Sequence, residues 1–505
     1  MRGGLAAAIV SALPLALGCD ATRALPPCGA PTPEPIDRAG PPAAGAAAVY
    51  WSSESAAFSL DAPDRAWFEC PRPIAHALER QPDVALAAAG STSAGAFALA
   101  LHPETLDQPV LGFGTSIEAA TVANLRALSR ADRDEVLTRI FDRDHGAGLD
   151  LVRVTIGTSD FTALPWYSYD DVPVEVGDPS LARFSVQRDI DDGIVEMLQT
   201  IHARWPEVRF FASPWSPPAW MKTTGVLTGG ALIDDDIAIY AHYLRRFIEA
   251  YAALGIPISA MTLQNESRAD NPDMPSCVVT AQQAARLAVA LRAELVIAGI
   301  DTRLWIYDHN FDAALDYVGD AFADPAARAA CDGVAFHDYA GDPTAMAAVR
   351  RRFPEQQIVF SEKMLWGIAG VDRVAQFFQN GATSYVSWVT MLDQDGKPNA
   401  GPNSDKPRLF TRDLATGGYW ATPEHFLFAL FARFVRPGAS RIVSDYGDPA
   451  HVTSVAFANQ DGSLVAIVAN QTQVEQTFAL TVRDRELTAT LPAGTAGAYT
   501  WYDTP

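Results

Sequence analysis

Two glutamates in this chain stand where a pair of carboxyl groups could do acid–base chemistry. Glu266 follows the apolar run Ile258–Gln264, directly after Asn265, and Glu362 ends the run Ile358–Glu362. A carboxyl group with a raised pKa can protonate a leaving oxygen, while a second carboxylate attacks the sugar carbon or activates water. Cleavage of a glycosidic bond needs such a facing pair and no metal. The two glutamates therefore predict glycoside hydrolysis if the fold brings them together.

Other polar and aromatic residues lie within or just after further apolar runs. They are Arg153, Asp160, Trp215, Asp308, His309, His337, Tyr339 and Trp388. For Arg153 the alternative is an ion pair inside the protein, and for His337 it is a core histidine satisfied by a neighbour.

The elements that would position these residues begin at Val110. Eight apolar runs alternate with helical patterns: Val110–Ser116, Leu149–Ile156, Val208–Ser213, Ile258–Gln264, Arg303–Asp308, Gly333–His337, Ile358–Glu362 and Thr383–Leu392. The expected helices include Ala119–Phe141, Thr280–Ile297 with a Thr280/Gln283 capping box, and Ile368–Gln379. This alternation predicts an α/β fold, a (β/α)8 TIM barrel over residues 110–432, with its active site at the carboxyl ends of the strands.

The segments on either side of the barrel carry strand patterns. Residues 46–109 contain short strand-like pieces such as Phe97–Leu101, and residues 433–505 contain alternating runs at Ser463–Ala469 and Phe478–Val482. We expect an appended β-sandwich built from the C-terminus and completed by the pre-barrel strands.

The N-terminus has the pattern of an export signal. Arg2 precedes the apolar stretch Leu5–Leu17, and Leu17-Gly18-Cys19 ends residues 1–19. The pattern predicts a lipoprotein-type signal with a lipid anchor on Cys19, at the membrane in the periplasm or at the cell surface. A plain signal peptide and a secreted protein are the alternative. Residues 20–45, rich in Pro and Ala, are expected to form a tether.

Four cysteines remain if Cys19 is lipidated. Cys28 and Cys70 could pair, while Cys277 and Cys331 are expected to be buried thiols.

The composition of the 505-residue chain argues against several other classes. Its 38 Lys and Arg residues against 60 Asp and Glu residues give a formal net charge of −22, which would repel a nucleic acid backbone. The chain carries no G-x-x-x-x-G-K-S/T phosphate loop, no His-Glu-x-x-His and no Cys-x-x-Cys pair. We therefore expect a carbohydrate or glycolipid substrate, no nucleic acid partner, no metal and no cofactor.

Several motifs resemble glycoside hydrolase family 30 of clan A, the family that includes the glucosylceramidases. The likeness runs from about Leu111 to the C-terminus. The matching segments are Gly112-Phe113-Gly114 with Glu118, Arg153–Phe161, the highly specific Ala212–Lys222, Ser361-Glu362, and Val435–Ile442.

The resemblance implies a role for each site residue. Glu266 would be the acid/base and Glu362 the nucleophile of a retaining mechanism, with Arg153 beneath Glu362 to keep it ionised. Asn265 would bind the sugar 2-hydroxyl, and Tyr339 would donate its hydroxyl to Glu362. The remaining substrate-binding residues would be Asp160, Trp215, His337 and Trp388.

The resemblance also implies a retaining β-glycosidase that hydrolyses β-D-glucosidic bonds, of glucosylceramidase type and hence acting on sphingolipids. Three departures leave the substrate open: Ser267 stands where many relatives have proline, Asp338 replaces an aromatic residue, and no Asn follows Trp388. An endo-β-1,6-glucanase, or an enzyme for xylan, fucosides or galactan, is the alternative. A non-catalytic carbohydrate-binding lipoprotein is the alternative from a different class.

Overall fold

The computed structural model describes residues 40–54, 70–71, 73–90, 95–402 and 406–502. The predicted signal peptide, Cys19 and Cys28 lie outside these residues, as does nearly all of the tether. Cys70 is disulfide-bonded, and Cys277 and Cys331 are buried free thiols, as predicted. Among the described helices, none combines the length and apolar character needed to cross a membrane.

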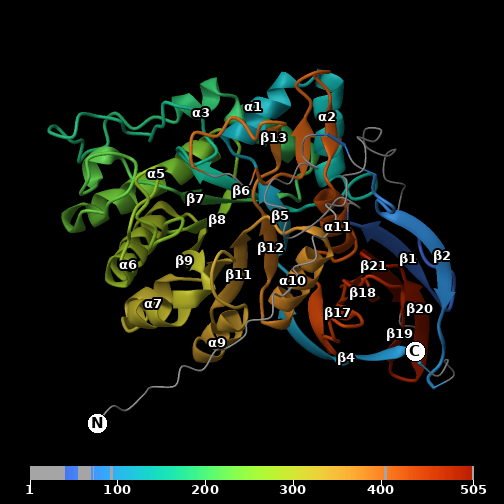
Figure 1. Cartoon of the computed structure of the whole chain (residues 1–505). Coiled ribbons are helices and arrows are strands. Elements are labelled where there is room, and N and C mark those ends of the chain that lie inside the picture. The colour runs from blue at the N-terminus through green and yellow to red at the C-terminus, as the bar shows by residue number, and fades with distance from the viewer. Residues whose placement is uncertain (1–39, 55–69, 72, 91–94, 403–405, 503–505) are drawn as a thin grey trace, which may run out of the picture.

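Eight parallel strands form the barrel, which confirms the predicted fold class (Figure 1). They are β5 (Gly112–Ser116), β6 (Leu151–Ile156), β7 (Arg209–Pro214), β8 (Ile258–Thr262), β9 (Arg303–Asn310), β10 (Gly333–His337), β11 (Gln357–Glu362) and β12 (Ser384–Ser387). Strands β5 to β11 follow each other in chain order, and β12 pairs with β5. Backbone bonds from Thr383 N–H to Ile358 O (2.8 Å) and from Lys363 N–H to Val386 O (3.2 Å) link β12 to β11. These bonds bring all the strand ends that carry the predicted site to one mouth.

Large and small apolar side chains fill the barrel interior. They come from seven of the strands: Leu151, Phe211, Ala260, Trp305, Ala335, Val359 and Val386. This packed layer supports the polar residues at the carboxyl ends of the strands, because a barrel of eight strands encloses only enough space for side chains.

Helices surround the barrel. They are α1 (Ala119–Ala127), α2 (Arg130–Phe141), α3 (Gln187–Asp191), α4 (Ile194–Arg204), α5 (Ile237–Ala253), α6 (Ala281–Ala298), α7 (Ala314–Ala321), α8 (Pro325–Ala330), α9 (Thr344–Arg352), α10 (Gly367–Gln379) and α11 (Pro423–Ala432). The predicted Thr280/Gln283 capping box starts α6. The single helix expected over Ala119–Phe141 is wrong, because Ser129 accepts a hydrogen bond from Asp132 N–H (3.1 Å) and starts a second helix there.

Strand 8 is also shorter than predicted. Strand β12 ends at Ser387, and the rest of the predicted run enters a separate three-stranded sheet. This sheet contains β13 (Met391–Asp393), β14 (Phe410–Arg412) and β15 (Tyr419–Ala421).

The sandwich strands form one ten-stranded sheet in the order β2-β1-β21-β18-β17-β16-β4-β19-β20-β3. Before the barrel come β1 (Ala46–Ser53), β2 (Glu79–Ala85), β3 (Ala87–Ala88) and β4 (Phe97–Pro109); after it come β16 (Ser440–Ser444), β17 (Thr453–Ala458), β18 (Ser463–Asn470), β19 (Gln476–Val482), β20 (Arg485–Leu491) and β21 (Thr495–Tyr502). Strand β1 lies between β2 and β21, and β4 lies between β16 and β19. Segments from before and after the barrel therefore build the sandwich together, as predicted.

Candidate active site

The two predicted glutamates meet at the carboxyl end of the barrel. Glu266 follows β8 and Glu362 ends β11. The Nδ1 atom of His337, at the end of β10, lies 3.8 Å from Glu266 Oε1 and 3.7 Å from Glu362 Oε1. Because both oxygens lie this close to one atom, their separation is at most about twice either distance. The barrel thus places the candidate acid and the candidate nucleophile next to the same histidine side chain.

Arg153, on β6, connects several of the predicted residues. Its buried guanidinium forms an ion pair with Glu362 and a second with Asp308 (2.9 Å). It also donates hydrogen bonds to Asn265 Oδ1 (2.8 Å) and Ser213 Oγ (3.1 Å). Burial opposes the charge of Arg153, but the two carboxylates raise its pKa. Arg153 therefore stays cationic and holds Glu362 and Asn265 in one arrangement.

Tyr339 contacts the opposite oxygen of the same glutamate. Its hydroxyl donates to Glu362 Oε1 (2.8 Å), and the Lys363 ammonium lies 3.9 Å from the centre of its ring. Burial of the hydroxyl, together with the charges of Glu362 and Glu266, raises the pKa of Tyr339 well above its ordinary value. The phenol therefore keeps its proton and remains a donor to Glu362.

Asp308 is the site residue to which the sequence assigned no role. This fully buried carboxylate on β9 accepts from Arg153, from His337 Nε2 (3.0 Å) and from Ser361 Oγ (2.6 Å). Burial raises its pKa, but Arg153 and His337 outweigh burial and hold that pKa below its ordinary value. The left-handed backbone at Tyr307 (φ 82°) and Asp308 (φ 49°) marks an irregular end of the strand. The signal in the sequence was an Asp closing an apolar run.

His337 lies among carboxylates that favour its charged form. Burial disfavours the charged ring, but the carboxylates of Glu362 and Asp308 raise the pKa of His337 to about 9. Burial also disfavours the charged form of Glu266, which for a carboxyl group means a higher pKa. The charge of His337 outweighs this effect and holds the pKa of Glu266 below its ordinary value. The expectation that the acid has a raised pKa is therefore wrong here, because an imidazolium lies beside it.

Aromatic rings form one wall of the site. Trp215 follows β7 and Trp388 follows β12, and their rings stack with centres 5.0 Å apart. The guanidinium carbon of Arg153 lies 4.9 Å from the Trp215 ring centre and 5.5 Å from that of Trp388. Asp160 is buried near these residues, and its charge contributes to the raised pKa of Tyr339. All the predicted site residues therefore gather at one mouth of the barrel.

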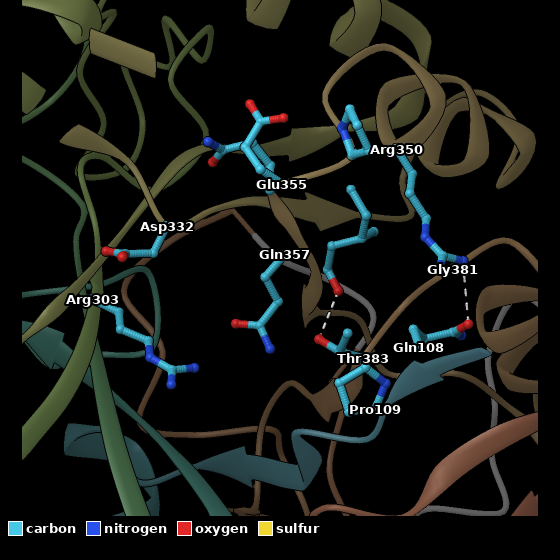
Figure 2. Close-up of a pocket in the computed structure, with 12 residues that line it drawn as sticks. Gln108, Pro109, Arg303, Asp332, Arg350, Glu355, Gln357, Gly381 and Thr383 are labelled. Atoms are coloured by element: carbon cyan, nitrogen blue, oxygen red, sulfur yellow. Dashed lines mark hydrogen bonds between the residues drawn. The ribbon is translucent and has the colours of Figure 1, made fainter. Parts of the chain in front are cut away.

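A cavity of about 390 Å³ lies at the opposite end, between the amino ends of β9 to β12 (Figure 2). Its two carboxylates, Asp332 and Glu355, form ion pairs with Arg292 and Arg328. It therefore offers no free carboxyl pair, and the chemistry stays at the carboxyl end. In the part of the chain that the structure describes, no cluster of His, Cys, Asp and Glu side chains could hold a metal ion.

A TIM barrel with two glutamates at its mouth, joined to a β-sandwich, defines the class of the glycoside hydrolases. Residues 110–434 match the glycosyl hydrolase family 30 TIM-barrel domain, and residues 438–499 match the family's beta sandwich domain. The chain belongs to glycosyl hydrolase family 30. It is therefore an enzyme that acts on carbohydrate, and the alternative of a non-catalytic binding protein is set aside.

Individual relatives are similar over most of the chain. An endo-1,6-beta-D-glucanase of Neurospora crassa is 30% identical over 404 residues, which cover 76% of this chain and 83% of that protein. The lysosomal acid glucosylceramidase of Mus musculus is 26% identical over 419 residues, which cover 77% and 80%. The solved structure of the endo-beta1,6-glucanase BT3312 superposes with a TM-score of 0.77 at 25% identity, over 91% of this chain and all of that one. The glucanase of Neurospora crassa is more similar in sequence to this chain than the glucosylceramidase of Mus musculus is.

Proposed function

We propose that this protein is a retaining endo-β-1,6-glucanase, with Glu266 as its acid/base and Glu362 as its nucleophile. The observation that carries the proposal is the approach of both carboxylates to one imidazole above Arg153. The glucanase relatives support the β-1,6 linkage.

The reaction takes two displacements. In the first, a Glu362 oxygen bonds to the anomeric carbon while Glu266, in the protonated form that acidic pH favours, gives its proton to the departing glycosidic oxygen. In the second, the Glu266 carboxylate takes a proton from water, the water oxygen bonds to the anomeric carbon, and Glu362 leaves as a carboxylate. Arg153 and Tyr339 hold the two oxygens of Glu362. In this proposal Asn265, whose Oδ1 accepts a hydrogen bond from Arg153, binds the 2-hydroxyl of the sugar.

The rim of the site supports cleavage within a chain. Only residues 338–343 separate β10 from α9, and residues 363–366 separate β11 from α10. Longer segments, 157–186 and 215–236, follow β6 and β7, and the segment before α3 reaches well beyond the barrel (Figure 1). Because the segments after β10 and β11 are short, we expect the rim to be low there and a polymer to pass on that side of the mouth.

Product analysis tests the linkage and the stereochemistry. The enzyme should release a ladder of oligosaccharides from linear β-1,6-glucan, and the first product seen by NMR should have the β configuration. Release of glucose alone would indicate an exo-acting enzyme, and faster hydrolysis of glucosylceramide would favour the glucosylceramidase interpretation. A first product with the α configuration would exclude the retaining mechanism.

Variants test the roles of the two glutamates. Glu362→Ala should abolish turnover, while Glu266→Ala should keep activity on an aryl glycoside with a good leaving group, and added azide should raise it. Glu355→Ala is a matched control, because this glutamate lies in the cavity at the opposite end of the barrel. Near-normal turnover by Glu362→Ala would contradict the assignment.

A further inference from the structure

His337 occupies an unusual position for a substrate contact. The side chain is fully buried, and its Nε2 atom is bonded to Asp308. Among the residues that the structure describes, its Nδ1 atom has no hydrogen-bond partner, and it lies at nearly equal distances, 3.8 and 3.7 Å, from Glu266 and Glu362. A core histidine satisfied by a neighbour would not leave this nitrogen between two carboxylates, and a buried ring cannot offer a sugar much contact. Neither interpretation from the sequence therefore accounts for its geometry.

The surroundings of the ring favour a cation there. Three carboxylates face it, from Glu266 after β8, Asp308 on β9 and Glu362 on β11. Arg153 on β6 supplies a positive charge that is paired with Asp308 and Glu362. Other titratable groups of the site are His309, whose pKa burial lowers to about 4, Tyr339, which keeps its proton, Lys363 over the Tyr339 ring, and Asp160. Three anions against one arginine leave an excess of two negative charges, which a charged His337 reduces to one.

We propose that His337 is a shared cation that tunes Glu266 and Glu362 together and contributes no binding energy for the sugar. This inference rests on the proposed roles of the two glutamates. Asp308 positions the ring through Nε2, so Nδ1–H points between the two reactive carboxylates. His337 is in these terms a positioning residue that acts through the glutamates.

The shared charge has a different effect in each half of the reaction. While Glu362 is an anion, it shares the imidazolium with Glu266. Once Glu362 has become a neutral ester, the cation acts on Glu266 alone and favours its carboxylate form. That is the form the second step needs, because Glu266 must then accept a proton from water.

Substitution by asparagine removes the positive charge. The asparagine side chain is neutral and its amide can donate toward the glutamates, but it is shorter than histidine, so His337→Asn also gives up the bond from Nε2 to Asp308. Without the cation the pKa of Glu266 should rise, so the basic limb of the kcat/KM profile should move up by about 1 pH unit or more. On an aryl glucoside for which hydrolysis of the glycosyl-enzyme is rate-limiting, the acidic limb of the kcat profile should also move to higher pH, because Glu266 must then be a carboxylate. KM should stay close to the wild-type value.

A neighbouring histidine provides the control. His309 is a second, largely buried imidazole close enough to act on Glu266, but it is neutral, so His309→Asn should leave both limbs in place. If His337→Asn does not fold, His337→Gln, whose amide can reach Asp308, is measured instead.

The outcomes distinguish this inference from the proposed function. A raised KM with unmoved limbs would mean that His337 binds substrate, and lost stability with unmoved limbs would mean a structural role; either result overturns the inference. If Glu362→Ala keeps its activity, the proposed function fails first. If Glu362→Ala is inactive and His337→Asn has unmoved limbs, only the shared cation is refuted.

Discussion

Replacement of Arg153 by methionine tests how much the site depends on one buried cation. Arg153→Met keeps an unbranched chain of similar length but removes ion pairs to Glu362 and Asp308 and hydrogen bonds to Asn265 and Ser213. Breaking a buried pair by removing one partner costs about 3–5 kcal/mol, because the other charge is left uncompensated. The free energy of unfolding should fall by about this amount.

The loss of activity should exceed what the loss of stability explains. Without Arg153, one oxygen of Glu362 is released from its fixed position, although Tyr339 still holds the other. A displacement of about 1 Å costs on the order of 100-fold in rate, so kcat/KM should fall at least that far in protein that is still folded. The measurements are urea unfolding and kcat/KM on an aryl β-glucoside at a temperature where the variant is native.

Arg441 is the matched control. It is also buried and pairs with Asp107 (2.5 Å), at the junction of the sandwich and the barrel. Arg441→Met should lose stability with a kcat/KM similar to that of the wild type. The reasoning is refuted if folded Arg153→Met retains near wild-type kcat/KM, or if Arg441→Met loses activity equally.

Two further substitutions test groups beside the site. Burial raises the pKa of Glu118 to about 7, from an ordinary 4.5, so the folded state keeps a proton that the unfolded chain releases. The free energy of unfolding should therefore fall as the pH rises from about 4.5 to 7, by up to about 3 kcal/mol, and urea unfolding of Glu118→Gln should show a flatter dependence; an unchanged slope would contradict this. Ser267 Oγ donates to the Tyr307 carbonyl (2.6 Å), so Ser267→Ala should lose about 1 kcal/mol in the same assay, and no loss would count against a role for this bond.

The sequence predicted the barrel well because its signals are local. The run Gly333–His337 matches β10 residue for residue, and the Thr280/Gln283 pair starts a helix as expected. The two errors in the predicted elements lie where the same local sequence pattern is compatible with two different structures. Ser129 interrupts a helical pattern that continues on both sides, and the apolar run after Ser387 continues into a different sheet.

The site, too, could be predicted only in part. Strand ends and the family resemblance located Glu266 and Glu362, because position in the barrel alone makes such residues neighbours. The role of Asp308 and the charge on His337 could not be predicted, because they depend on which side chains from β6, β9 and β11 face one another. The lowered pKa of Glu266 is a consequence of that network and was expected with the opposite sign.

The pairing of β1 with β21 makes the order of synthesis important for folding. Ala48 lies opposite Thr500, so β1 is made about 450 residues before its partner, which at 5–20 residues per second means about 20 to 90 s. Neighbouring barrel strands follow each other in the chain and can pair as they emerge, whereas β1 must wait beside a barrel that is already forming. Strand β21 enters the sheet between β1 and β18, so a strand made after the whole barrel joins a strand made before it to the rest of the sandwich. A chain that stops short of β21 would carry two unpaired strand edges, the kind of surface that promotes aggregation.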